Sequence, residues 1–291
     1  MKRLFVLVAL LATALAAPVQ SRLVTETLHS NTLGVDQHYN VYLPDGYSPV
    51  RHYPVIYLLH GLSDDYDAWN TKGRMKDVAD ELIASGELVP VVIIMPNGGD
   101  ADIYQYQNGY FNMPGWPFED WFFREFLPAV EGKYNCGGSK GQRAIMGLSM
   151  GGGGSVVYSQ RHPGLFSSCY AMSPWLDNKN MEVQGEDRPL SKLEITQQSV
   201  CDHSAMDFLE RADEASLDQL RSVKWFIDCG DDDFILDLSL QFYALMRAKN
   251  VKAELRVRDG VHNWEYWNQS LRWALPFASE HFRPALTGAG D

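Results

Sequence analysis

The residues Gly147-Leu148-Ser149-Met150-Gly151 form a G-x-S-x-G motif, in which two glycines flank a serine. An apolar run over residues 143–148 precedes this serine and a helical pattern over residues 149–162 follows it, so Ser149 is expected on a sharp strand-to-helix turn. Such a turn lifts the hydroxyl clear of the sheet, next to a helix N-terminus that stabilises developing negative charge. A phosphate-binding loop would need a lysine after the glycines, which is absent here. A packing turn with an incidental serine is the remaining alternative.

A serine hydroxyl needs a histidine to take its proton, and a carboxylate to fix the tautomer of that histidine. In doubly wound hydrolases the acid and then the histidine follow the serine along the chain. His262 comes just after a predicted strand, where ligand-facing groups gather. The acid is expected after the strand at residues 224–229, and three candidates follow it: Asp231, Asp232 and Asp233. The residues by themselves do not choose among the three.

The alternation of strands and helices predicts the scaffold that positions these residues. Strands are expected at 23–29, 37–43, 55–59, 91–95, 143–148, 165–172, 224–229 and 253–257, and helices at 75–85, 117–134, 149–162, 205–222, 235–249 and 264–282, with Pro128 kinking the second helix and Pro276 interrupting the last. This order indicates an α/β protein with a mainly parallel, doubly wound sheet and helices on both faces. We expect one domain over residues 17–291, with the polar stretch 177–204 as an insertion over the sheet.

The composition excludes several classes of protein. Hydrophobic residues make up 45% of the 291 residues, which is enough for a sizeable core. With 25 Lys and Arg against 37 Asp and Glu, the formal charge of −12 argues against a nucleic-acid partner. The four cysteines form no C-x-x-C pair and the acidic run lacks the calcium-loop pattern, so neither a metal nor a cofactor is expected. Cys169 and Cys229 are interpreted as buried thiols, whereas a Cys136–Cys201 bridge stays open.

The N-terminal residues resemble a secretory leader. Lys2 and Arg3 precede an apolar run over residues 4–15, and Ala14-Leu15-Ala16 supplies a small-residue cleavage pattern. The run is shorter than the roughly 20 residues that span a bilayer. We therefore expect a signal peptide over residues 1–16 and export of the mature protein to the periplasm or the extracellular space, with no membrane span after its removal.

The chain resembles the esterase D-like branch of the α/β-hydrolase fold. This branch includes feruloyl and acetylxylan esterases of carbohydrate esterase family 1, S-formylglutathione hydrolases and mycolyltransferases. The resemblance rests on Leu58-Leu59-His60-Gly61-Leu62, the serine motif, Cys229-Gly230-Asp231-Asp232-Asp233 and His262-Asn263-Trp264-Glu265-Tyr266-Trp267. In that family the acid is the third residue after the glycine and the histidine opens the last motif. The resemblance thus implies a triad of Ser149, Asp233 and His262.

The resemblance also implies an oxyanion hole formed by the backbone N–H groups of Leu62 and Met150. Leu62 follows a predicted strand end, and Met150 opens the helix after the nucleophile, so both positions suit this role. Two such donors stabilise the oxyanion of a tetrahedral intermediate, and removal of one typically costs about a hundredfold or more in rate.

Aromatic residues in the loops after the strands suggest the substrate class. Sugar rings and a feruloyl ring both suit aromatic faces, although several of these side chains would equally fill the core. The candidates for substrate binding are Tyr106, Tyr110, Trp116, Trp175 and Trp264. With export, they favour a serine carboxylester hydrolase that releases feruloyl or acetyl groups from polysaccharide esters. The alternatives are an acyltransferase of the mycolyltransferase type, an S-formylglutathione hydrolase-like thioesterase and a non-catalytic carbohydrate-binding protein on the same fold.

Overall fold

The computed structural model describes residues 20–178 and 188–283. The predicted leader, residues 1–16, lies outside the described residues, as does part of the insertion predicted at 177–204. None of the described helices is long and apolar enough to cross a membrane.

An eight-stranded sheet forms the centre of the molecule and confirms the predicted doubly wound α/β class. Its order is β1 (Arg22–Ser30), β2 (Val35–Leu43), β4 (Val92–Pro96), β3 (Val55–Leu59), β7 (Arg143–Leu148), β8 (Ser168–Met172), β9 (Lys224–Gly230) and β10 (Ala253–Arg258). β2 pairs antiparallel with both β1 and β4, and all other pairs are parallel. The carboxyl ends of β3, β7, β9 and β10 therefore meet at one edge, where the chemistry-bearing residues were expected.

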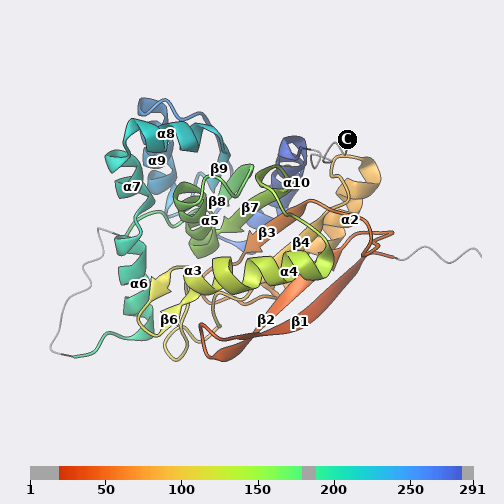
Figure 1. The fold of residues 1–291 in the computed structure, drawn as a ribbon. Coiled ribbons are helices and arrows are strands. Elements are labelled where there is room, and N and C mark those ends of the chain that lie inside the picture. Colours follow the sequence, from red (N-terminus) through yellow and green to blue (C-terminus); the bar gives the residue numbers. More distant parts are fainter. Residues whose placement is uncertain (1–19, 179–187, 284–291) are drawn as a thin grey trace, which may run out of the picture.

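Helices cover both faces of the sheet (Figure 1). Along β3, the side chains of Val55, Tyr57 and Leu59 enter one core cluster, while Ile56 and Leu58 enter the other. The first cluster is covered by α3 (Phe118–Trp121), α4 (Leu127–Tyr134), α5 (Ser149–Arg161) and α9 (Leu236–Ala248), and the second by α2 (Met75–Ser85) and α10 (Trp264–His281). The fully apolar central strands are thus explained by burial on both sides.

Three of the predicted helices differ from the structure. Between α3 and α4 the chain forms a π-helical turn over Phe122–Phe126, which lets the helix accommodate the missing N–H of Pro128. The helix predicted at 205–222 is two helices, α7 (Ala205–Arg211) and α8 (Glu214–Arg221), because Asp213 caps the second one by accepting a hydrogen bond from Ser216 N–H. α10 continues through Pro276 as far as His281.

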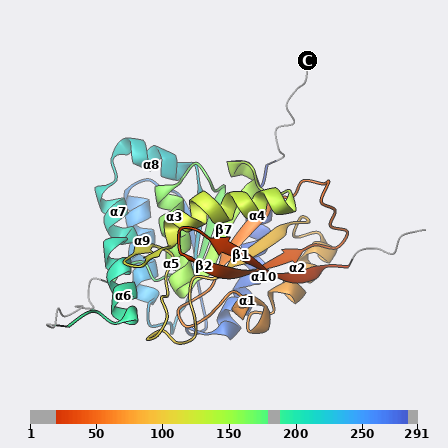
Figure 2. The same cartoon turned by 60° about the horizontal axis from the view of Figure 1, so that its bottom comes forward.

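The predicted insertion contains a helix of its own, α6 (Lys192–Asp202). Its start is a capping box: the Ser191 hydroxyl accepts from Glu194 N–H, and the Glu194 carboxylate accepts from Ser191 N–H. Figures 1 and 2 both place α6, α7, α8 and α9 together at one end of the molecule, with α2 at the other. The short elements that complete the described chain are α1 (Ala68–Thr71), the hairpin strands β5 (Asn112–Met113) and β6 (Trp116–Pro117) and a 3₁₀ turn at Lys140–Gln142.

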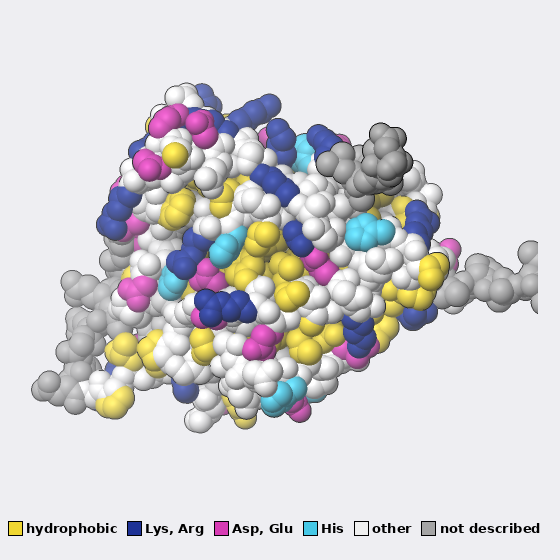
Figure 3. All heavy atoms as spheres, in the orientation of Figure 1, with side chains coloured by type: hydrophobic (Ala, Val, Ile, Leu, Met, Phe, Trp, Pro, Cys, Tyr) yellow, Lys and Arg dark blue, Asp and Glu magenta, His cyan; other side chains and the backbone are white. Residues whose placement is uncertain are grey.

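All four cysteines, each within the described residues, are free thiols, so Cys136 and Cys201 form no bridge in this structure. Cys169 and Cys229 are buried, as expected from their strands. On the face shown in Figure 3, acidic and basic side chains are scattered among neutral ones and neither kind gathers into a single patch.

Candidate active site

Ser149 stands at the start of α5 in a backbone conformation that side chains other than glycine rarely adopt, with φ of 51°. The two motif glycines make this turn possible. A Cβ on Gly147 would lie 2.5 Å from the Gly151 carbonyl oxygen, and one on Gly151 would lie 2.5 Å from the carbonyl oxygens of Leu59 and His60. The strained turn is therefore packed directly against the end of β3, and it directs Ser149 into a cavity.

The structure brings Ser149, His262 and Asp233 together from three separate segments. His262 Nε2 lies 3.0 Å from Ser149 Oγ, and His262 Nδ1 lies 2.9 and 3.0 Å from the two carboxylate oxygens of Asp233. With Nδ1–H donating to the carboxylate, Nε2 is left free to accept the serine proton. This arrangement is what a nucleophile, a general base and an orienting acid require.

The Asp233 carboxylate is fully buried beneath His262. Burial raises its pKa, but hydrogen bonds from His262, from the Ser173 side chain and from Ile235 N–H outweigh that effect, and the net pKa lies below its ordinary value. The carboxylate is therefore ionised at neutral pH and offers a fixed negative charge to an imidazolium.

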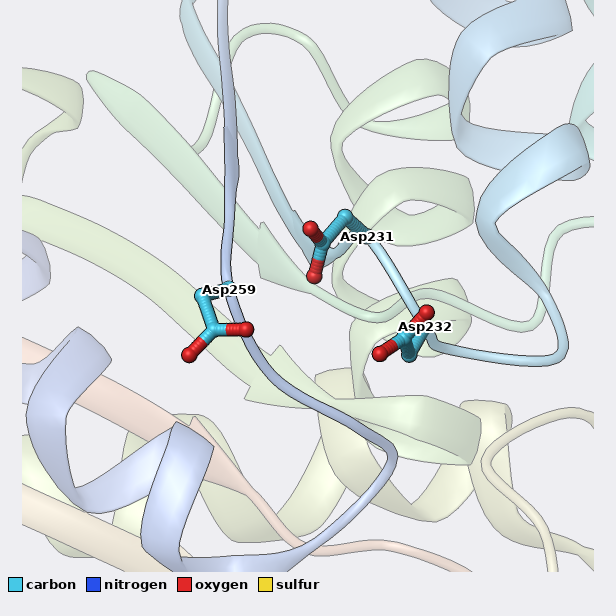
Figure 4. Close-up of side chains that lie close together, drawn as sticks. All are labelled: Asp231, Asp232 and Asp259. Atoms are coloured by element: carbon cyan, nitrogen blue, oxygen red, sulfur yellow. The ribbon is translucent and has the colours of Figure 1, made fainter.

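The other two acids of the run point elsewhere. Asp231 and Asp232 lie beside Asp259 at the surface, with their carboxylate oxygens within 4.8 Å of one another (Figure 4). Asp231 accepts a hydrogen bond from Gly260 N–H at 3.0 Å. Neither Asp231 nor Asp232 makes a hydrogen bond with His262 in the described part of the chain.

The loop after β3 brings the Leu62 backbone to the same place. A Cβ on Gly61 would lie 2.6 Å from Leu148 Cδ1 and 3.6 Å from Ser149 Cβ, so only glycine lets this loop pass so close to the serine turn. Leu62 then lines the cavity, and Met150 is the first residue of α5 after the serine, where an N–H has no intrahelical acceptor. Both predicted oxyanion donors thus belong to segments that flank Ser149.

A cavity of about 1100 Å³ opens above these residues. Its floor is formed by the ends of the strands, and one wall is formed by α6, α7 and α9. The lining residues include Gly61, Leu62, Ser149, Trp175, Leu193, Gln197, Met206, Glu210, Leu238, Gln241, His262, Trp264 and Trp267. Such a volume holds an aromatic acyl group together with part of an alcohol.

A family model described as “Putative esterase” matches residues 30–278 of this chain. The chain belongs to this esterase family. The match confirms that the predicted resemblance is to an esterase. A solved structure of a ferulic acid esterase is 45% identical, with a TM-score of 0.87, and the match covers 91% of this chain and 100% of that one.

Two further relatives extend the comparison. The S-formylglutathione hydrolase FrmB from Staphylococcus aureus shares the fold, with a TM-score of 0.71 at 22% identity over 89% of this chain and 99% of that one. An endo-1,4-beta-xylanase/feruloyl esterase of Xylanibacter ruminicola is 33% identical over 145 residues, which is 48% of this chain. The matched region spans 20% of the length of that relative.

The esterase uses its aromatic residues differently from the prediction at three of five positions. Trp175 and Trp264 line the cavity, as expected. Tyr106 is 58% exposed and does not line it, and Trp116 stacks on Phe118 and donates its indole N–H to the Gly109 carbonyl. Both lie in the long segment after β4, which contributes Ile103 to the cavity lining instead of these two aromatic residues.

Tyr110 is the third exception. It is buried in the core, where it hydrogen-bonds to the backbone at the end of β3 instead of lining the cavity. Its hydroxyl accepts from His60 N–H at 2.9 Å and lies 3.1 Å from the His60 carbonyl oxygen, to which it donates. The His60 ring in turn accepts from Gly98 N–H at Nε2 and contacts the Gly61 carbonyl through Nδ1. Burial lowers the pKa of His60, so the ring is neutral and can do both. These contacts hold the end of β3 and the loop that carries Leu62.

The sequence analysis did not identify Ser173, a buried residue whose contacts support His262. Ser173, at the end of β8, has φ of 42°, is fully buried and accepts a hydrogen bond from Trp267 Nε1 at 3.1 Å. The Trp267 ring packs edge-to-face with the His262 ring, with centroids 4.8 Å apart. A serine after a buried strand is too common a pattern to be singled out from sequence, although Trp267 stood within the histidine motif.

A third buried residue, Asp228, fixes the position of the segment that carries His262. It is fully buried in β9, and its carboxylate accepts hydrogen bonds from the hydroxyls of Tyr170 and Tyr266. Tyr266 packs against Gly260, where a Cβ would lie 2.4 Å from its ring. Because Tyr266 is in the first turn of α10, this contact fixes the segment that carries His262.

Proposed function

We propose that this protein is a serine esterase that releases feruloyl or related acyl groups from polysaccharide esters through an acyl-enzyme. The observation that carries the proposal is the contact chain from Ser149 Oγ through His262 to the Asp233 carboxylate, at the floor of a cavity lined by Trp175 and Trp264.

In the acylation step, Ser149 Oγ attacks the ester carbonyl carbon while His262 Nε2 takes the hydroxyl proton. The resulting imidazolium is stabilised by the buried, ionised Asp233. The oxyanion of the tetrahedral intermediate accepts hydrogen bonds from Leu62 N–H and Met150 N–H. Collapse of the intermediate breaks the bond to the alcohol oxygen, which receives the proton from His262.

In the deacylation step, a water molecule gives its proton to His262 Nε2 and attacks the acyl carbonyl. The same two N–H groups stabilise the second oxyanion. The bond to Ser149 Oγ then breaks, the serine recovers its proton from His262, and the carboxylic acid leaves.

Two observations support the feruloyl class of substrate. The 45% identical relative is a ferulic acid esterase, and the relative from Xylanibacter ruminicola combines a xylanase with a feruloyl esterase. In addition, the indole of Trp264 packs at right angles against the rings of both Trp69 and Trp267. These contacts hold it in place as a rigid aromatic surface for a flat acyl group.

The test is hydrolysis of methyl ferulate and of 4-nitrophenyl acetate by the purified protein and by Ser149→Ala. We expect the wild type to release ferulate, and the variant to lose at least about four orders of magnitude in kcat while keeping its fold. Ser159→Ala, a serine in the same helix that does not line the cavity, is the matched control. Absence of activity on both esters in the wild type contradicts the proposal, and formation of feruloyl glycerol in added glycerol would reveal acyl transfer.

We also propose that the protein is exported. The support is the order of basic, apolar and small residues at positions 2–16. Mass spectrometry of the protein secreted by its host, or by an expression host, should find a chain that begins at Ala17. An intact N-terminus on protein that stays in the cytoplasm would contradict the proposal.

A further inference from the structure

The helical wall of the cavity repeats one arrangement on three helices. Each of α6, α7 and α9 contributes an aliphatic residue and, three or four positions later, a residue with a side-chain carbonyl or carboxylate. Residues at this spacing lie on the same side of a helix. The pairs are Leu193 with Gln197, Met206 with Glu210, and Leu238 with Gln241. The wall thus offers apolar contact and hydrogen-bond acceptors side by side.

The charges that line the cavity are mostly negative. Lys72 is the lysine of the lining, and its Nζ lies 2.7 Å from the buried carboxylate of Asp64, so these two charges cancel. Asp177 is nine-tenths buried and accepts hydrogen bonds from Asn178 N–H and from the Ser204 hydroxyl.

Glu210 and Asp237 add two exposed carboxylates to the wall. Neither makes an ion pair within the described part of the chain. Lys249 contacts Glu210, but through the main-chain carbonyl, and Lys249 does not line the cavity.

We propose that this wall, formed by α6, α7 and α9, binds the alcohol part of the ester and selects a neutral, hydroxyl-rich alcohol over one that carries a carboxylate. The inference rests on the proposed esterase activity and specifies its substrate. Sugar hydroxyls donate hydrogen bonds to the Glu210 and Asp237 carboxylates and to the amide oxygens of Gln197 and Gln241, while the aliphatic residues contact the C–H face of the ring. A carboxylate on the alcohol cannot donate a hydrogen bond, and the negative charges of Glu210 and Asp237 repel it.

The experiment compares two feruloyl monosaccharides that differ in one group. One is a feruloyl ester of methyl glucoside, and the other is the same ester of the corresponding uronic acid, in which a carboxylate replaces the CH₂OH group. We expect wild-type kcat/KM to favour the neutral ester by about tenfold at low salt, and the preference to shrink as salt is added because exposed charges are screened.

Glu210→Gln and Asp237→Asn keep the size of each side chain and remove its charge. Each should lower the preference by about two- to fivefold, mainly through a faster reaction of the anionic ester. Glu254→Gln, which changes another exposed carboxylate, on β10 and away from the cavity, is the matched control and should leave the preference unchanged.

The outcomes separate the two proposals. Equal kcat/KM for both esters, or a preference that both variants leave unchanged, overturns the assignment of the wall while the esterase activity stands. Absence of turnover with both saccharide esters, while methyl ferulate is hydrolysed, also overturns the assignment of the wall. Absence of turnover with the saccharide esters, methyl ferulate and 4-nitrophenyl acetate alike rejects the esterase proposal and this inference with it.

Discussion

The floor and the wall of the cavity are built in different ways. On the floor, Ser149, Leu62 and His262 are carried by short turns at strand ends, where backbone atoms touch backbone atoms and added Cβ atoms at Gly147 and Gly151 would collide with carbonyl oxygens. The wall is made of helices that present side chains at regular spacing, several of them partly exposed.

This contrast indicates that the floor carries the reacting groups and that the wall selects the substrate. Reacting groups must be held to within a fraction of an ångström, which requires a rigid backbone and buried hydrogen bonds such as those of Asp228 and Ser173. A wall of helical side chains tolerates substitution, because changing one residue alters contacts without moving the backbone. We therefore expect substitutions on the floor to reduce kcat or folding and substitutions on the wall to alter KM.

After Ser149→Ala, the largest effect is expected from Asp233→Asn. The amide cannot fix the His262 tautomer or stabilise an imidazolium, so kcat should fall by about 10³–10⁴-fold with the protein still folded. Asp231→Asn and Asp232→Asn are the matched controls, since both carboxylates point to the surface beside Asp259 (Figure 4). Steady-state hydrolysis at about pH 7.5 measures all three. Similar losses at the three positions would mean that the acid is assigned wrongly.

Gly151→Ala tests the backbone contact of the floor. Its Cβ would lie 2.5 Å from two carbonyl oxygens, so the variant should lose several kcal/mol, about 3 or more, in unfolding free energy, or fail to fold. Gly132→Ala in α4, where the new Cβ meets nothing within 4 Å, should instead stabilise by about 0.5–1 kcal/mol. Urea denaturation gives both values. A folded Gly151→Ala protein with wild-type stability would contradict this account of the turn.

Ser173→Ala tests the group that supports the histidine. It leaves the Trp267 indole N–H without its buried acceptor and removes a hydrogen bond to Asp233, so kcat should fall by about 10–100-fold while KM changes little. Trp267→Phe removes the N–H together with the five-membered ring of the indole and keeps an aromatic ring beside His262. If Ser173 acts through Trp267, the double variant should be no slower than Ser173→Ala. Multiplicative losses in the double variant would show that the two residues act separately.

Leu193→Ala tests the wall. Loss of its side-chain contact should raise KM for a feruloyl saccharide about three- to tenfold and leave kcat close to wild type. Leu190→Ala, three residues earlier and outside the cavity lining, is the control. A fall in kcat with unchanged KM would place Leu193 with the floor rather than with the wall.

The smallest effect is a pH dependence that originates in the floor. Burial holds the pKa of His60 below its ordinary value of 6.5, so the unfolded chain binds the proton more readily than the folded one. The stability contributed by neutral His60 is therefore complete above about pH 6.5 and is lost as the pH falls, by at most about 1.4 kcal/mol per pH unit. Urea denaturation between about pH 7.5 and 5 should show this slope in the wild type. An equal slope in His60→Asn would assign it to other groups.

Much of the fold and of the floor was predictable because it depends on local patterns. Each strand of the sheet except β8 was placed to within about two residues, since runs such as Val55–Leu59 are buried on both faces. The positions of the loop aromatics were less predictable. Tyr110 and Trp116 are chemically able to bind a substrate, yet in the segment that contains the β5–β6 hairpin their side chains pack within the protein instead of facing the cavity. Pattern does not tell which side of a loop faces the cavity.

The sequence by itself determined the doubly wound sheet, the serine turn and the order of serine, acid and histidine, because strand periodicity and required glycines act over a few residues. The residue pattern left open which of three adjacent aspartates meets His262, which aromatics line the cavity and which helices form its wall, and the tertiary structure decided all three. Those outcomes depend on the directions of side chains from segments far apart in the chain. Ser149 and His262 are 113 residues apart in the chain, yet Ser149 Oγ lies 3.0 Å from His262 Nε2.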